Sequence, residues 1–260
     1  MSWSLLVAVG EEDRDIVAAE LWDRGATGIL EEDGRLRAFF EVRDEAVEAG
    51  FPGEWREEAD RDWAAEWSTA WRPIELGDRL FLVPDWLADP TPPGRVRIET
   101  HPGRAYGTGT SEATQLALLG LERHLRPGDR VLDVGTGTGI LSVAAVKLGS
   151  ARVYACDIDP DAVEVADANI HRDEITVHLF AGSVRSVRTG FVDLAVANIN
   201  ATTIALAAEE LARILKPGGR LVASGFLESD VPRVREALAG LSEIEKLDRN
   251  HWSALVFRRG

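Results

Sequence analysis

The stretch Val131-Leu132-Asp133-Val134-Gly135-Thr136-Gly137-Thr138-Gly139-Ile140 decides the fold of this chain. Aliphatic residues that favour strands lead into a turn with glycine at every second position, and an apolar helical pattern runs on to Leu148. The sequence therefore predicts a strand, a tight turn and a helix. Glycine lets the backbone come close to a ligand and take positive φ, and the helix N-terminus behind the turn offers that ligand unpaired N–H groups.

The end of the next strand narrows the class of ligand. Residues 151–157 predict a second strand that ends in Asp157. An acid about twenty residues after the glycines commonly binds the ribose hydroxyls in nucleotide-binding α/β sheets. The dinucleotide fingerprint G-x-G-x-x-G needs glycine where this chain has Ile140, which argues against NAD and FAD. A glycine-rich loop of some other doubly wound protein is the alternative.

Composition bounds the remaining classes. A chain of 260 residues can hold one large domain, or a medium domain with a small one attached. Cys156 is the single cysteine, so no intrachain disulfide can form, and a cytoplasmic location is expected. The 5 histidines have no zinc-ligand spacing, so no metal is expected. We expect neither a signal peptide nor a membrane span, because a basic leader and a long apolar run are both missing from the sequence.

The acidic residues are concentrated at one end of the chain. Residues 1–66 contain 19 Asp/Glu and 7 Lys/Arg, a balance of −12, which leaves −3 of the total −15 for the rest. Such a segment repels nucleic acid phosphates and attracts a basic partner. We therefore expect no direct nucleic-acid binding, although a solvated surface selected for solubility would show the same charge.

Residues 1–54 are expected to form a small α+β domain that recognises the substrate. A strand at 3–9, a helix from about 16 to 25 and a hairpin of 28–32 with 36–42 give the order strand, helix, strand, strand. This order is typical of a ferredoxin-like unit, and the short helix expected at 44–49 would leave it incomplete.

Residues 55–73 are expected to form a linker helix. Trp63, Trp67 and Trp71 recur every four residues, which places three indoles along one helical face before Pro73. Tryptophans at this spacing indicate packing of the linker helix against one or both domains. An aromatic surface that binds the substrate is the alternative.

Residues 74–260 are expected to form a Rossmann-like doubly wound sheet that binds the cofactor. A second glycine-rich loop at 101–110 ends at a helix that Ser111 or Thr110 could cap, and it could cover the ligand or serve as a hinge. Ligand-facing residues belong at the carboxyl ends of parallel strands. The residues expected at such ends are Gly135, Asp157, Ser183 and Asn198.

These stretches together resemble the ribosomal protein L11 methyltransferase family, whose members are class I enzymes that use S-adenosylmethionine. The glycine turn followed by Asp157-Ile158-Asp159-Pro160 resembles motif I and the acid after it. The loop Pro102-Gly103-Arg104-Ala105-Tyr106-Gly107-Thr108-Gly109 and the fourth-strand end Val196-Ala197-Asn198-Ile199 are the more specific matches. Three residues depart from the family pattern, which puts the substrate or the degree of methylation in question: Tyr106, Ser111 and Ala113.

The resemblance implies a role for each matching position. It places Thr114, Gly135, Asp157 and Asn198 in contact with S-adenosyl-L-methionine, Gly137 beside its methionine part and Ser183 close to adenine. It places Tyr106 near the sulfonium, with Thr108 and Gly109 in the loop that covers it. It implies a ferredoxin-like N-terminal domain that holds the L11 protein, in agreement with the acidic first quarter.

Amine methylation is an in-line displacement, in which positioning is the main task of the protein. No convincing general base stands out among the motif residues, so the hypothesis is that Asn198 orients the amine while Tyr106 and the 107–109 loop exclude water. The sequence leaves open a methyltransferase of the same fold for another basic protein or a small amine, and a non-catalytic adaptor that binds the cofactor. It also leaves open the oligomeric state, for which a monomer is plausible.

Overall fold

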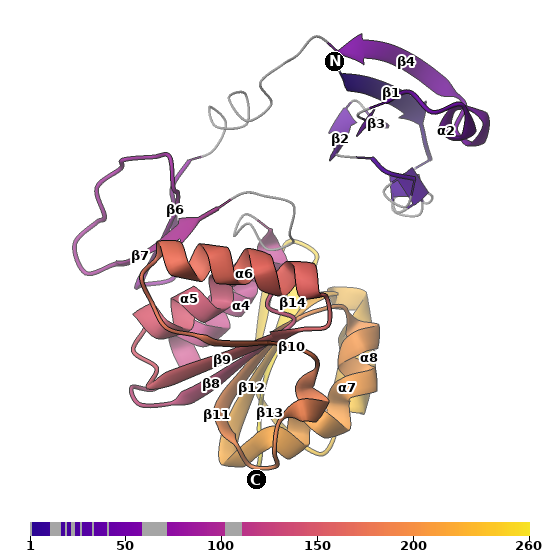
Figure 1. The fold of residues 1–260 in the computed structure, drawn as a ribbon. Helices are drawn as coiled ribbons and strands as arrows, with labels where there is room; N and C mark the ends of the chain where they lie inside the picture. Colours follow the sequence, from indigo (N-terminus) through magenta and orange to yellow (C-terminus); the bar gives the residue numbers. More distant parts are fainter. Residues whose placement is uncertain are drawn as a thin grey trace. The chain divides into compact units, whose positions relative to one another are not determined.

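The computed structural model describes residues 2–10, 17–18, 20–21, 24–26, 28–32, 34–40, 42–58, 72–101 and 111–260 (Figure 1). Contacts between residues divide the chain into two compact units, Met1–Trp71 and Arg72–Gly260.

The first unit contains a four-stranded antiparallel sheet in the order β2-β3-β1-β4. Helical residues at 17–18 and 20–21 precede β2, and a short helix separates β3 from β4. This is the complete ferredoxin-like arrangement, so the expectation of an incomplete unit is wrong. Its elements are β1 (Ser2–Ala8), β2 (Gly28–Glu32), β3 (Arg35–Phe40), α2 (Glu45–Gly50) and β4 (Gly53–Glu58).

Strand β4 corrects the predicted start of the linker helix. The expected helix began at residue 55, but residues 55–58 belong to β4, which pairs antiparallel with β1. Trp55 lies 5.3 Å from Phe40 between ring centroids and packs against the core of this unit. That non-local contact stabilises the strand, and a helical pattern of tryptophans could not reveal it. Trp63, Trp67 and Trp71 lie outside the described residues.

The second unit begins with a three-stranded sheet of β5 (Ile74–Leu76), β6 (Leu80–Pro84) and β7 (Val96–Thr100). Strands β5 and β6 pair antiparallel, while β6 and β7 pair parallel. Strand β5 has only three residues. Helix α4 (Glu112–His124) has Ser111 as its N-cap, one of the two predicted caps.

A seven-stranded sheet in the order β10-β9-β8-β11-β12-β14-β13 forms the body of this unit (Figure 1). Neighbouring strands from β10 to β12 are parallel, and β14 pairs antiparallel with both β12 and β13. This confirms the predicted Rossmann-like doubly wound sheet. The strands are β8 (Arg130–Val134), β9 (Arg152–Asp157), β10 (His178–Ala181), β11 (Val192–Asn198), β12 (Leu215–Leu227), β13 (Ser242–Arg249) and β14 (Trp252–Arg258).

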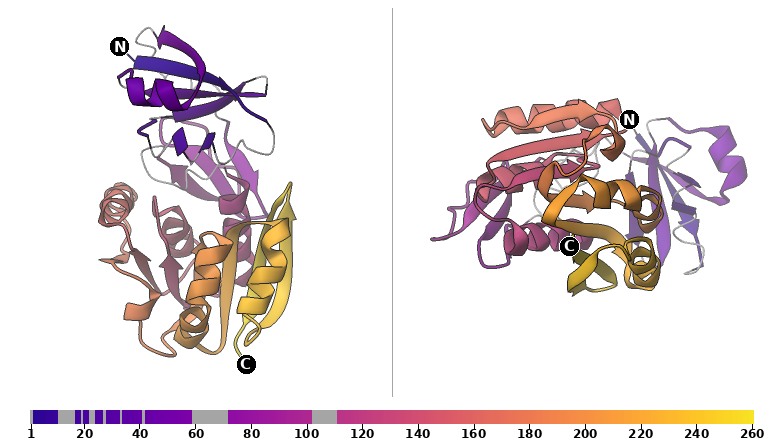
Figure 2. Two further views of the ribbon diagram at one scale, coloured as in Figure 1. Left: turned by 90° about the vertical axis from the view of Figure 1, so that its right-hand side faces the viewer. Right: turned by 90° about the horizontal axis from the view of Figure 1, so that it is seen from below.

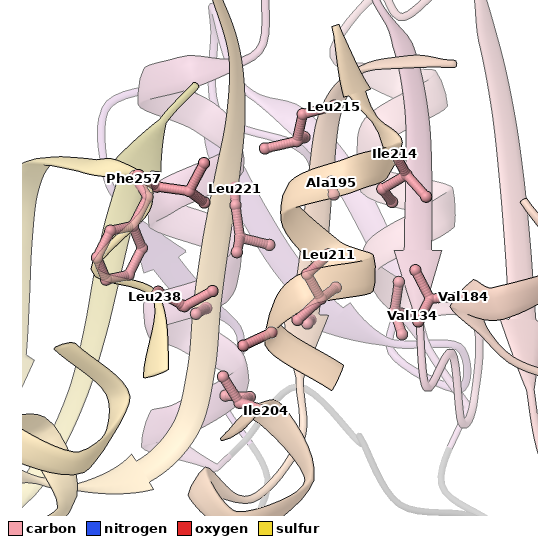
Figure 3. Packing of buried hydrophobic residues seen from close by; sticks show 14 of the residues in the cluster. Val134, Val184, Ala195, Ile204, Leu211, Ile214, Leu215, Leu221, Leu238 and Phe257 are labelled. Atoms are coloured by element: carbon pink, nitrogen blue, oxygen red, sulfur yellow. The ribbon is translucent and has the colours of Figure 1, made fainter. Parts of the chain in front are cut away.

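Helices cover both faces of the sheet because its side chains alternate in direction. On one face Val131 and Val153 pack in a cluster with α4, α5 (Ile140–Lys147) and α6 (Pro160–Arg172). On the other face Leu132 packs in a cluster with α7 (Ala201–Ile214) and α8 (Val231–Ala237). Figure 3 shows Ile204, Leu211 and Ile214 of α7 pointing at the sheet, and Figure 2 shows the sheet between its two helix layers.

The parallel order brings the carboxyl ends of β8, β9, β10 and β11 to one edge, where the predicted ligand residues meet. None of the helices in the described ranges is long and apolar enough to cross a membrane.

Candidate active site

The glycine turn has the backbone conformation that its composition predicts. Gly135, Gly137 and Gly139 have φ of +73°, +53° and +83°, where residues with a side chain are strained. A Cβ on Gly135 would lie 2.6 Å from Ile199 Cγ2, so the space here admits only glycine. The N–H groups of Gly135 and Thr136 donate to the Cys156 carbonyl at 2.9 and 3.1 Å, which ties the turn to β9.

Asp157 stands at the carboxyl end of β9 with its carboxylate fixed in place. Its Oδ2 accepts from the Gly137 N–H at 3.0 Å, and its Oδ1 accepts from the Asp159 N–H at 3.1 Å. Each carboxylate oxygen has two acceptor sites, so one on each oxygen is left for a ligand. A pair of ribose hydroxyls fits this arrangement.

Asn198 and Thr114 come together although they lie far apart in the sequence. Asn198 Nδ2 donates to Thr114 Oγ1 at 3.1 Å, and the Ser111 hydroxyl donates to the same oxygen at 2.8 Å. Asn198 Oδ1 is buried and accepts no hydrogen bond within the described part of the chain. A buried acceptor without a donor is costly, so this oxygen is available for the N–H of a ligand or substrate.

Ser183 follows β10 and is the N-cap of the 3₁₀ turn Val184–Ser186. Its hydroxyl accepts from the Arg185 N–H at 3.4 Å, and the neighbouring Gly182 N–H donates to the Asp157 carbonyl at 2.7 Å. The placement beside Asp157 agrees with the expected strand end, and the contact of Ser183 with adenine stays a prediction. Tyr106, Thr108 and Gly109 lie outside the described residues.

Asp133 lies in β8, directly before the glycine turn, and the sequence pattern assigned it no role. Its side chain is fully buried, and Oδ2 accepts from the hydroxyls of Thr136 and Ser142 at 2.8 Å each. Burial raises the pKa of Asp133 to about 6, while the two hydroxyl hydrogen bonds oppose the rise. An acid inside an otherwise apolar strand was the available signal, because such a residue is rarely buried without a purpose.

Burial also raises the pKa of the Cys156 thiol to about 12, and the nearby Asp133 carboxyl adds to this effect. Cys156 is completely buried, so it serves as a core residue of β9.

The arrangement fits a nucleoside cofactor that lies across the carboxyl ends of the strands. Asp157 offers acceptors for a ribose, the glycine turn allows close approach of the backbone, and α5 begins directly behind the turn. Asn198 and Thr114 offer polar groups on the β11 side of the turn. Among the described residues, no group of three histidines, cysteines or acids could hold a metal ion.

Comparison with known proteins identifies the family. The family model described as ribosomal protein L11 methyltransferase (PrmA) matches residues 13–260. A protein of that name from Thermus thermophilus is 37% identical over 253 residues, which are 95% of this chain and 96% of the relative. One from Listeria monocytogenes is 40% identical over 208 residues, which are 77% of this chain and 66% of the relative. The chain thus spans slightly less than two thirds of the Listeria protein.

A solved structure supports the same assignment. The crystal structure of a ribosomal protein L11 methylase from Lactobacillus delbrueckii subsp. bulgaricus superposes with a TM-score of 0.68 at 33% identity. The superposition covers 73% of this chain and all of that one. With the glycine turn, Asp157 and Asn198 in place, and a family model that matches almost the whole length, this chain belongs to the ribosomal protein L11 methyltransferase family.

Proposed function

We propose that the protein transfers methyl groups from S-adenosyl-L-methionine to amino groups of ribosomal protein L11, on lysine side chains, on the N-terminus or on both. Family membership supports the reaction class, and the relatives' names supply the substrate. A cytoplasmic location agrees with this substrate and with the single buried cysteine.

The buried Asn198 Oδ1 is the observation that carries the proposal. It lies at the carboxyl end of β11, and Thr114 holds the amide by accepting from Nδ2. Because Oδ1 has no donor among the described residues, it is available as an acceptor. A substrate amine can donate an N–H to it, which aims the nitrogen lone pair away from Asn198 and toward the group to be transferred.

S-adenosyl-L-methionine supplies a methyl group on a positively charged sulfur. Asp157 would hold its ribose, the glycine turn would approach its methionine part, and Thr114 and Asn198 would lie beside the reacting amine. The amine must be neutral when it attacks, so the site must lower its pKa by desolvation or pass its proton to water. We propose that Tyr106, Thr108 and Gly109 exclude water during this step.

The charge of the first unit fits a basic protein substrate. Residues 1–66 have a balance of −12, which attracts a basic surface over a long range. We therefore assign substrate recognition to the ferredoxin-like domain, which includes β4 and so extends past residue 54 to residue 58, and cofactor binding to residues 74–260.

Radiolabelled S-adenosylmethionine and undermethylated ribosomal proteins test the proposal directly. Label on lysines or on the N-terminus of L11, located by mass spectrometry, is the expected result. Label on another protein would overturn the substrate, and tight cofactor binding without any label would favour a non-catalytic adaptor.

The Asn198→Ala variant tests the orienting role. Turnover should fall at least tenfold while cofactor affinity falls less, because the lost contact is made to the amine. Single-turnover rates and calorimetric cofactor affinities separate the two effects. The Asn198→Asp variant is the matched control, because it keeps the size of the side chain and an acceptor oxygen. Equal losses of turnover and cofactor affinity in Asn198→Ala would contradict the role.

A further inference from the structure

Apart from the site at the carboxyl ends of its strands, the seven-stranded sheet has a polar surface on the face that α7 and α8 cover only in part. Along the chain, a 3₁₀ turn connects β10 to β11, whereas a helix lies in each of the other connections between successive parallel strands, β8 to β9, β9 to β10 and β11 to β12 (Figure 1). His178 is exposed and Tyr154 and Phe191 are half-buried, so this part of the face reaches solvent. We call the surface formed by the following residues the β9 patch: Arg130, Arg152, Tyr154, His178, Arg188 and Phe191.

Three aromatic rings contact one another in sequence in the β9 patch. Tyr154 and His178 are stacked with centroids 4.8 Å apart and planes at 26°, and Phe191 meets Tyr154 edge-on at 5.0 Å. The stack ends on His178, which is exposed at the edge strand β10. A further planar ring can therefore continue the stack on His178.

Arginines surround the rings. The guanidinium carbons of Arg130 and Arg188 lie 4.4 and 4.8 Å from the Phe191 centroid. Arg152 stands next to Arg130 in the parallel register of β8 and β9. Cation–π contacts of this kind hold the guanidinium planes in place while leaving N–H groups free to donate.

The positive charges of these arginines are largely not neutralised by carboxylates. Within the described residues no acid forms an ion pair with Arg130, Arg152 or Arg188. Asp193 accepts from Lys216 Nζ through both oxygens, at 2.8 and 2.7 Å, and from the backbone N–H of Arg130 at 2.9 Å. Residues 175–192 contain no Asp or Glu, in a chain that has 44 of them among 260 residues. The patch is therefore locally basic on an acidic protein.

We propose that the β9 patch binds single-stranded RNA. Guanidinium groups suit phosphates and an exposed ring stack suits unpaired bases, and this combination is typical of surfaces that bind single strands. An acidic peptide would satisfy the arginines but would leave the ring stack without a partner. The expectation of no nucleic-acid binding came from the acidic residues 1–66, whereas the basic surface is made by residues from four other segments. A ribosomal protein substrate would bring RNA close to the enzyme, but the proposal does not depend on that substrate.

Fluorescence anisotropy of a labelled 12-nucleotide single-stranded RNA, titrated with the full chain in 50 mM salt, tests the proposal. The double variant Arg152→Ala/Arg188→Ala should bind at least tenfold more weakly. Its plot of log affinity against log salt should be shallower by about 1.4, at about 0.7 per lost phosphate contact. His178→Ala should weaken binding about tenfold through the lost stacking on a base.

The double variant Arg172→Ala/Arg249→Ala is the matched control. It lowers the net charge by the same two units, and its arginines lie on α6 and on β13 at the opposite edge of the sheet. It should bind RNA nearly as tightly as the wild type, and calorimetric cofactor binding should be normal in all variants.

Three outcomes would overturn the proposal: no RNA binding by the wild type, equal losses in both double variants, or equally strong binding of a polyglutamate peptide that His178→Ala leaves unchanged. The last outcome would identify a general anion surface instead.

Discussion

Replacing Asp133 by Asn should change how stability depends on pH. Asp133 is fully buried, and its pKa is raised from 3.8 to about 6 mainly by desolvation of the carboxylate. A difference of about two pH units corresponds to about 3 kcal/mol, at about 1.4 kcal/mol per unit. Asparagine has nearly the same shape and keeps an acceptor for Thr136 and Ser142, but it does not titrate.

The sign follows from the raised pKa. Below about pH 3 the carboxyl is protonated in both the folded and the unfolded chain, and the folded state has its full stability. As the pH rises through about 6, the folded state must ionise a buried group, and the wild type loses this contribution. The Asp133→Asn variant has no such loss, so it should gain stability relative to the wild type by about 3 kcal/mol between pH 4 and pH 7.5.

Urea unfolding followed by circular dichroism at several pH values measures the effect. Other carboxyls, including Glu243 and Asp248 with lowered pKa values, change stability with pH in the opposite direction. They are common to both proteins and cancel in the difference between them. A difference that stays constant from pH 4 to pH 7.5 would refute the assignment of a raised pKa to Asp133.

Three further predictions follow from the packing. Gly135→Ala should lower the free energy of unfolding by about 2 kcal/mol or more, because positive φ and the contact with Ile199 act together. Gly94 has φ +79° and open space around it, so Gly94→Ala should lower the free energy of unfolding by only about 1 kcal/mol. Equal decreases for the two variants in urea unfolding would contradict the role of the Ile199 contact. Arg220→Met should lower the free energy of unfolding by about 3–5 kcal/mol, because it leaves buried Asp129 without its ion-pair partner at 2.9 Å. Arg235→Met breaks an exposed ion pair and should lower the free energy of unfolding by less than about 1 kcal/mol. Similar melting temperatures for the two variants would speak against a buried ion pair. Cys156 should resist iodoacetamide at pH 8 until the chain unfolds, because the thiol is buried and its pKa is raised to about 12. Rapid labelling of the native protein, detected by mass spectrometry, would show instead that strand β9 opens.

Most of the cofactor half could be predicted from local pattern. The glycine turn, the acid at Asp157 and the strand ends at Ser183 and Asn198 all lie where the alternation of apolar strands and helices indicated. These features are readable because each depends on neighbours within a few residues: glycine for positive φ, β-branched residues for strands and periodic apolar residues for helices.

Features that depend on distant partners were missed. Strand β4 is held by pairing with β1 and by packing of Trp55 on Phe40, and neither partner is near it in the sequence. The raised pKa of Asp133 depends on burial by the whole sheet. The β9 patch is assembled from β8, β9, β10 and the segment before β11, so the charge balance of any single stretch of sequence could not reveal it.

By itself the sequence determined the class of fold, the glycine turn, the acid that suits a ribose and the resemblance to a methyltransferase family, because local geometry and residue chemistry specify these features. Only the tertiary structure decided that Asn198 lies against Thr114 with one oxygen unpaired, that β4 completes the first sheet, and that four scattered segments form a basic aromatic surface. Strand pairing and burial determine these arrangements, and both act between residues that are distant in the sequence.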